Sequence, residues 1–104
     1  MIEDMQVMRE VLQLWRKNLP KYPINALKFY DQEKELHIVS DDTLFILSLS
    51  GGIGEMKTLI DMLNGEQINP RRQSYIDMRV PGSVYTCARD ETECTRNLAR
   101  IYES

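Results

Sequence analysis

The sequence has few of the residues on which small metal sites and enzyme active sites depend. Its 104 residues include one histidine, His37, and two cysteines, Cys87 and Cys94. A structural zinc site takes four ligands, so these three residues would need a carboxylate to complete one. A cysteine nucleophile would have His37 as its only imidazole base. We therefore expect no catalytic residue, no metal and no cofactor in a protein that is not an enzyme.

The sequence also lacks an excess of positive charge and a long apolar run. Its formal net charge is −3 and no segment gathers Lys and Arg, so the phosphate contacts that drive nucleic-acid binding have no source. No apolar run reaches the roughly 18 residues that cross a bilayer. We expect one soluble domain over residues 1–104 that binds no nucleic acid, either natural in this form or excised from a membrane-tethered protein.

Apolar residues at helical spacing predict two amphipathic helices. The first covers residues 3–19 and ends at Pro20, and the second covers residues 55–65. The residues expected to face the core from the first helix are Met5, Met8, Leu12, Trp15 and Leu19. Those expected from the second are Met56, Leu59, Ile60 and Leu63. Both helices should pack on a sheet.

The sheet is predicted from segments that alternate apolar and polar residues. Residues 25–30, 35–40 and 43–49 are separated by polar turns, which is typical of a three-stranded antiparallel meander. Alternation in the middle segment places His37 on the outward face. Later segments at residues 75–80 and 83–86 complete the sheet. The fold class expected is α+β with a mainly antiparallel sheet.

Asp77 and Arg79 lie within the fourth strand segment, and their role bears on function. Ile76, Met78 and Val80 alternate with them and should face the core. The charged pair then lies on the more solvent-facing side, where such a pair contributes only about 0–1 kcal/mol to stability. Pro81 and Gly82 bend the chain after it. Because Pro cannot donate to a sheet ladder, this pattern indicates a sheet edge.

Cys87 and Cys94 flank a polar turn and leave three states open. They could form a disulfide, which would be consistent with an extracytoplasmic location, remain free thiols, or form half of a metal site. The tail that contains them is expected to end in a short helix capped by Thr92 or Thr95. The tail residues expected to face inward are Cys94, Leu98 and Ile101 or Tyr102.

The segment QSYIDMRVPGSVYT, residues 73–86, resembles the C-terminal β domain of the bacterial cell-division family FtsQ/DivIB. That family shows an aromatic–aliphatic–Asp–aliphatic–Arg strand, a short bend and a final edge strand. Tyr75, Ile76, Asp77, Met78 and Arg79 fill the first element. The preceding order of helix, meander and helix is also similar, so the resemblance covers approximately residues 8–86.

The resemblance implies a noncatalytic scaffold of the divisome. FtsQ/DivIB proteins are single-pass membrane proteins whose extracytoplasmic part binds the coiled-coil, membrane-anchored proteins FtsB and FtsL. Their last strand receives a strand of the partner by β-augmentation. Carried onto this sequence, the partner-binding residues would be Arg79, Val80, Ser83, Val84, Tyr85 and Thr86, with Tyr85 as the aromatic anchor.

The chain differs from the family at both ends. It contains neither the membrane segment nor the POTRA domain, and its tail, residues 87–104, extends past the family's usual final strand. The tail could cover the edge that should bind. The alternatives are another extracytoplasmic binding module, of envelope assembly or secretion, and a small cysteine-dependent enzyme.

Overall fold

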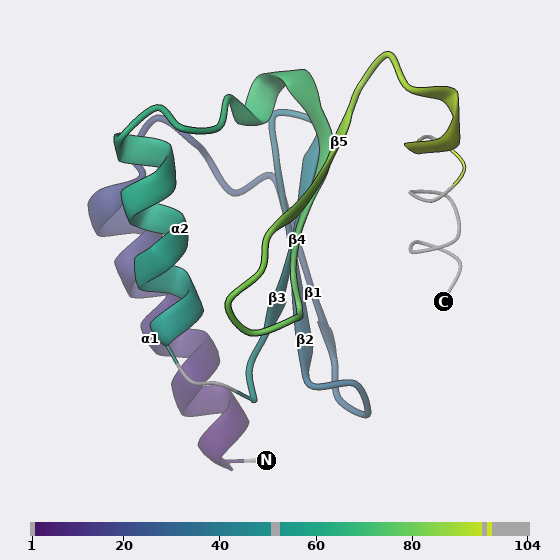
Figure 1. The fold of residues 1–104 in the computed structure, drawn as a ribbon. Coiled ribbons are helices and arrows are strands. Elements are labelled where there is room, and N and C mark those ends of the chain that lie inside the picture. The colour runs from purple at the N-terminus through teal and green to yellow at the C-terminus, as the bar shows by residue number, and fades with distance from the viewer. Residues whose placement is uncertain (1, 51–52, 95, 97–104) are drawn as a thin grey trace.

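The computed structural model describes residues 2–50, 53–94 and 96 of the chain, and its elements follow one another in an α+β order (Figure 1). Helix α1 (Ile2–Asn18) precedes strands β1 (Ala26–Tyr30), β2 (Glu35–Ser40) and β3 (Thr43–Ser48). Helix α2 (Gly54–Asn64), the short 3-10 helix η1 (Pro70–Arg72), and strands β4 (Gln73–Met78) and β5 (Tyr85–Ala88) complete the order. No described helix has the length and hydropathy needed to span a membrane.

The five strands form one sheet in the order β1-β2-β3-β4-β5. β1, β2 and β3 pair antiparallel as a meander, and β5 pairs antiparallel with β4. β4 pairs parallel with β3, because α2 carries the chain back along the sheet before β4 begins. The expected α+β class with a mainly antiparallel sheet is confirmed, and β1 and β5 are its two edges.

Aspartates close the turn between β2 and β3, as the sequence indicates. Asp41 and Asp42 both adopt positive φ, 47° and 67°, which a two-residue hairpin of the type I′ class requires. The Asp41 amide donates to the side-chain oxygen of Asn25 at 2.7 Å. These carboxylates therefore serve the backbone of the turn.

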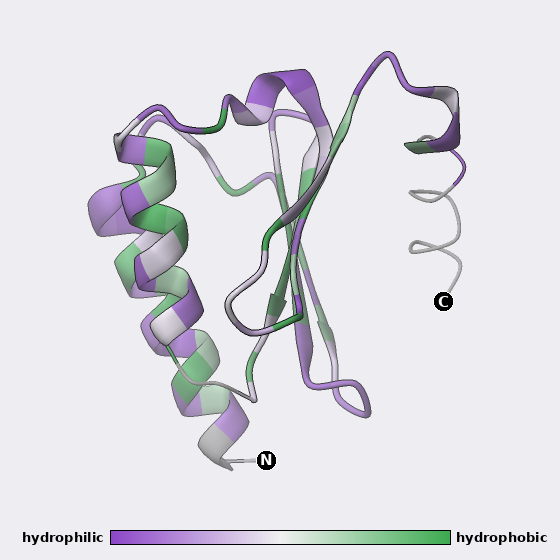
Figure 2. Cartoon of the chain, in the orientation of Figure 1, coloured by the Kyte–Doolittle hydropathy of each residue, from purple (hydrophilic) through white to green (hydrophobic). Residues whose placement is uncertain are grey.

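Both helices lie on one face of the sheet, and their apolar stripes build the main core (Figures 1 and 2). Trp15 packs edge-on against Phe45 with ring centroids 4.9 Å apart, and its indole N–H donates to the Tyr22 carbonyl at 2.7 Å. The expected positions Leu19, Met56 and Leu59 are buried in this core. An aromatic pair thus joins α1 to the centre of β3.

One position of the expected α1 stripe is wrong. Met5 is 55% exposed, whereas Val11, which the pattern omitted, is buried. The face that meets the sheet follows a spacing of four, through Val11, Trp15 and Leu19, and Met5 lies off that line.

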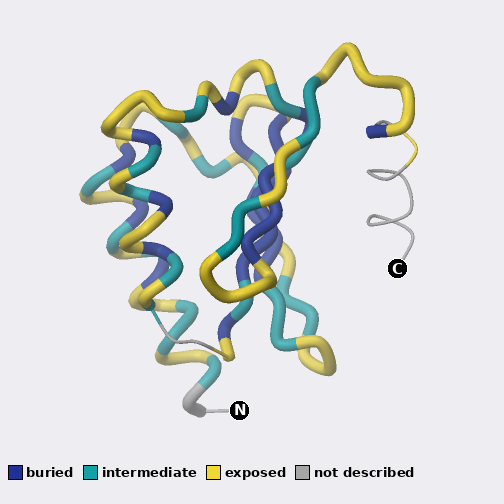
Figure 3. The backbone as a smooth tube through the Cα atoms, viewed as in Figure 1, coloured by how far each residue is buried: buried dark blue, intermediate teal, exposed yellow. Residues whose placement is uncertain are grey.

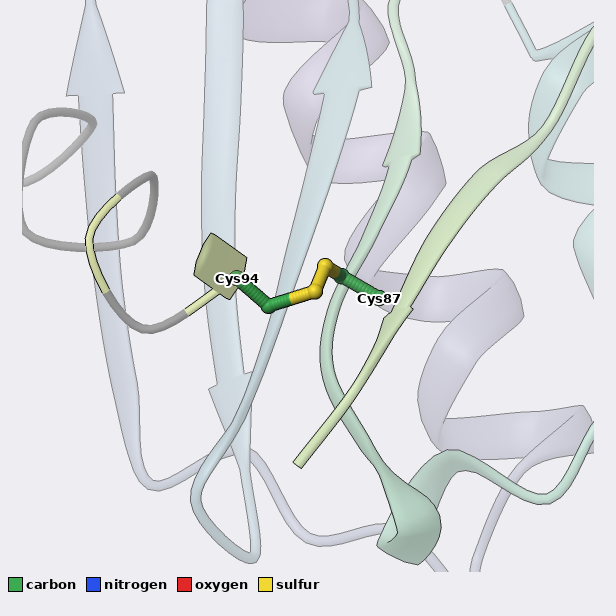
Figure 4. The surroundings of a disulfide bond; sticks show 2 residues. All are labelled: Cys87 and Cys94. Carbon is green, nitrogen blue, oxygen red and sulfur yellow. A yellow bond between two sulfur atoms is a disulfide. The ribbon is translucent and has the colours of Figure 1, made fainter. Parts of the chain in front are cut away.

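The opposite face of the sheet is also closed at its centre. Leu44 and Ile46 of β3 point away from the helices and are fully buried. Figure 4 shows Cys94 in front of this face, joined to Cys87 of β5. The burial map shows buried residues along the central strands and exposed ones at the turns (Figure 3).

The two cysteines form a disulfide, which decides between the three states considered above. Their Cα atoms are 5.5 Å apart, within the usual range for a disulfide. Among the described residues no cluster of His, Cys, Asp and Glu could hold a metal ion. Thr92 is already helical, so it is not the cap that the sequence suggested. Thr95, Leu98, Ile101 and Tyr102 lie outside the described residues.

We expect reduction of the disulfide to lower the free energy of unfolding by about 2–3 kcal/mol, because the cross-link closes a short loop in the unfolded chain. Urea unfolding with and without dithiothreitol measures this difference. The double variant Cys87→Ala/Cys94→Ala should match the reduced protein and show no response to the reductant. An equal midpoint for oxidised and fully reduced wild type would contradict the expectation.

Candidate strand-docking edge and the polar cluster beside it

β5 has a backbone edge that the described part of the chain leaves open. It pairs with β4 through Asp77↔Tyr85, Ile76↔Thr86 and Tyr75↔Cys87, and no described strand lies on its other side. The Arg89 amide donates to the Arg72 carbonyl at 3.0 Å, so odd-numbered residues of β5 turn their amides toward β4. Since this direction alternates along a strand, Thr86 directs its N–H and C=O outward.

The structure places the sequence-predicted docking residues in two groups. Tyr85, which is 53% exposed, and Thr86 belong to β5, as expected. Val80 and Ser83 instead form a turn, in which the Ser83 amide donates to the Val80 carbonyl at 3.1 Å.

The turn explains why the last strand begins later than residue 83. Pro81 and Gly82, with φ 77° at Gly82, are the central pair of a type II turn, whose geometry favours these two residues. The chain needs Ser83 and Val84 to return to the sheet, so the strand starts at Tyr85. It then continues through Cys87 and Ala88, which the sequence had placed in the tail.

Arg89 fixes the far end of β5, and sequence reasoning missed it. Its guanidinium donates to the Arg71, Asp42 and Asp41 carbonyls at 2.6, 3.2 and 3.1 Å, and to the Thr43 hydroxyl at 2.7 Å. Arg89 therefore ties the end of the edge strand to η1 and to the β2–β3 turn. No local pattern around Arg89 could have indicated this role, because its acceptors are backbone carbonyls distant in sequence.

A groove of about 180 Å³ lies next to this edge, between α2 and the β4–β5 connection. One side is formed by Glu55, Thr58 and Met62, which are spaced three and four apart and so share one face of α2. The other side is formed by the apolar residues Met78, Val80 and Val84, together with Gly82 and Ser83. Most of the groove wall is thus apolar, and its one ionisable group is Glu55.

The Glu55 carboxylate is held inside this setting by a single backbone contact. Its Oε2 accepts a hydrogen bond from the Ser48 amide at 3.3 Å. Burial raises the pKa of Glu55, and the Ser48 bond only partly opposes that rise. No ion pair joins Glu55 to a cationic side chain of the described residues, so its charge is not neutralised within this part of the chain.

Asp77 and Arg79 form a close pair on the sheet face opposite the helices. Arg79 Nε donates to both carboxylate oxygens of Asp77 at 2.9 and 3.1 Å, and Nη2 donates to Oδ2 at 2.6 Å. The hydrogen bonds from Asp77 raise the pKa of Arg79. The expected attraction is confirmed, but the Asp77 side chain is only 12% exposed, so the solvent-facing position was wrong.

His37 belongs to the same face and is buried, which corrects the outward position expected for it. Its side chain is 5% exposed, its Nε2 lies 3.1 Å from Glu35 Oε1, and its ring stacks at 4.4 Å on Tyr30. Arg79 reaches Glu35 Oε2 at 3.7 Å, so the cluster spans β1, β2 and β4. The alternation assigned the correct face to His37, but it could not show that this face is covered.

The polar cluster could have been recognised from two i,i+2 pairs, Glu35/His37 and Asp77/Arg79, because each pair shares a strand face. In the described part of the chain, His37 Nδ1 and Tyr30 Oη have no hydrogen-bond partner. Both cysteines are in the disulfide, so neither is a thiolate nucleophile in this state. The cluster cross-links strands and keeps Arg79 directed into the sheet.

Comparison of the chain with models of protein families, with curated proteins and with solved structures finds no match. The function must therefore be argued from the geometry of the edge and its groove.

Arg79→Ala should destabilise the fold by about 1–3 kcal/mol, because it leaves the largely buried Asp77 carboxylate without its hydrogen-bonded cation. Chemical unfolding of the single variants and of Asp77→Asn/Arg79→Ala forms a double-mutant cycle. We expect the double variant to be more stable than the sum of the two single effects predicts. Purely additive effects would show that the pair has no coupling.

Glu55→Gln should make the protein more stable at neutral pH than the wild type. Because the pKa of Glu55 is higher in the folded state, the folded state retains the proton longer, and wild-type stability falls as pH rises from the unfolded pKa through the folded one. Below that window the two proteins should be equally stable.

Urea unfolding between pH 3.5 and 7.5 measures the stability difference between Glu55→Gln and the wild type. Asp61→Asn, on the exposed side of α2, controls for the loss of one negative charge. A constant difference between Glu55→Gln and wild type across the range would contradict the assignment.

Proposed function

We propose that the chain is a noncatalytic binding domain that receives one extended strand of a partner protein beside β5. The observation that carries this proposal is the open backbone edge at Thr86. Unpaired N–H and C=O groups at a sheet edge give main-chain affinity, and pockets for alternate side chains give selectivity. The groove at α2 provides such a pocket on one side of the edge, and exposed Tyr85 provides an aromatic contact on the other.

The β5 edge is also prepared for binding before the partner arrives. The β4 ladder, the Cys87–Cys94 disulfide and the Arg89 hydrogen bonds all hold the strand in place. A strand that is already ordered loses less conformational entropy on binding. Rigidity of this kind is what a template strand requires.

The opposite edge, β1, has a different character. Lys28 lies in its middle with its ammonium 4.9 Å from the Tyr30 ring centroid. Lysine on an edge strand is a common device against unwanted pairing. This contrast favours β5 as the edge that binds.

The resemblance to FtsQ/DivIB supports a partner class of membrane-anchored, coiled-coil division proteins of the FtsB/FtsL type. It also supports a location on the extracytoplasmic side of the bacterial membrane, with the domain carried by a longer single-pass protein. The disulfide is in keeping with that location, since disulfides persist in oxidising compartments. Under this proposal the domain recruits division proteins. In that setting the bond also keeps β5 attached to the rest of the domain.

Thr86→Pro should abolish binding of the soluble extracytoplasmic fragment of an FtsB-type protein from the same genome. Proline removes the outward amide and keeps the fold, because it is tolerated on the solvent side of an edge strand. Thr86→Ala retains the amide and should bind like wild type. Titration calorimetry measures binding, and urea unfolding confirms that both variants are folded.

Two results would overturn parts of this proposal. Equal binding of the fragment by wild type and Thr86→Pro would exclude strand addition at β5. No binding of FtsB-type or FtsL-type fragments by the wild type would exclude the division partners, and the domain would then be an envelope-assembly or secretion module.

A further inference from the structure

We propose that the partner strand carries a lysine or arginine whose side chain occupies the groove between α2 and β5 and pairs there with Glu55. This inference rests on the proposed strand addition at β5 and specifies what the domain selects. It concerns one side-chain position of the partner, and it follows from how an added strand would lie against the groove.

A strand beside β5 would direct alternate side chains toward the helix layer. Thr86 pairs directly with Ile76, a buried core residue of the helix-side face, so Thr86 marks that face on the edge. Val84, two residues earlier, lies on the same face and lines the groove. A partner side chain opposite this stretch therefore points toward α2 and into the groove.

The chemistry of the groove matches a long side chain with a cationic end. Met62, Met78 and Val80 provide apolar wall for an aliphatic stem, and the Glu55 carboxylate provides an acceptor for the charged head. Lysine and arginine combine these two parts. A purely apolar side chain would enclose the Glu55 carboxylate against methyl groups without a partner, which is unfavourable.

Charge favours the same occupant. Burial already raises the pKa of Glu55, so a cation in the groove would relieve a carboxylate that the protein holds in an unfavourable setting. The nearby cation Arg79 does not take this role, because its guanidinium is bound to Asp77 and reaches Glu35 on the other face. The net charge of −3 also favours approach of a basic segment.

A displayed library of random ten-residue peptides, selected on the disulfide-intact protein, provides the probe. Wild type should enrich peptides with alternating apolar residues and one Lys or Arg in the helix-facing set. Selection on Glu55→Gln should retain the alternating pattern and lose the basic preference. Asp61→Asn, which removes a carboxylate of the same helix outside the groove, should select like wild type.

The strongest peptide then tests the pair directly by fluorescence anisotropy. Replacing its basic residue by methionine should weaken binding to wild type about tenfold or more, since a hydrogen bond to a charged group is lost. The same replacement should have little effect on binding to Glu55→Gln.

The outcomes separate this inference from the proposed function. If no selected peptide loses affinity for Thr86→Pro, strand addition at β5 is wrong. If the peptides are sensitive to Thr86→Pro but carry no basic preference, or lose it equally on Asp61→Asn, only the Glu55 pairing is wrong. A homodimer that Thr86→Pro dissociates and that excludes the peptides would assign the edge to a second copy of the chain and overturn the inference.

Discussion

Burial of β3 on both faces is the constraint on which the rest of the structure depends. Phe45 and Leu47 pack against the helices, while Leu44 and Ile46 point the other way and are equally buried. A strand of this kind requires cover on two sides. Two helices supply one cover, and the chain after β5, joined back through the Cys87–Cys94 disulfide, passes over the other side.

The same arrangement shapes the edge that we assign to binding. Because the chain after β5 turns onto the second face, it leaves the outer side of β5 free of described strands (Figure 1). Arg89 and Cys87 then hold the strand from its end and from within. The features that close the second face are therefore also those that keep the edge ordered, and the groove at α2 gives this edge a chemical preference.

The sequence predicted the elements well where their signals are local. The strand Glu35–Ser40 agrees to the residue, because alternation and flanking turn residues mark both of its ends. It misjudged His37 and Asp77, since alternation assigns a face but cannot show what covers it. The later start of β5 follows from the type II turn at Pro81–Gly82, whose return residues read as strand. Arg89 and the Glu55 groove depend on contacts between distant segments, which no pattern in one stretch encodes.

The parallel pairing of β3 with β4 has a consequence for how the sheet assembles. β1, β2 and β3 follow one another through short turns, whereas β4 can join β3 only after α2 and η1 have crossed over. Closing that longer loop costs more chain entropy before any contact forms. The meander is thus the early part of the sheet, and the binding edge is the part of the fold completed last.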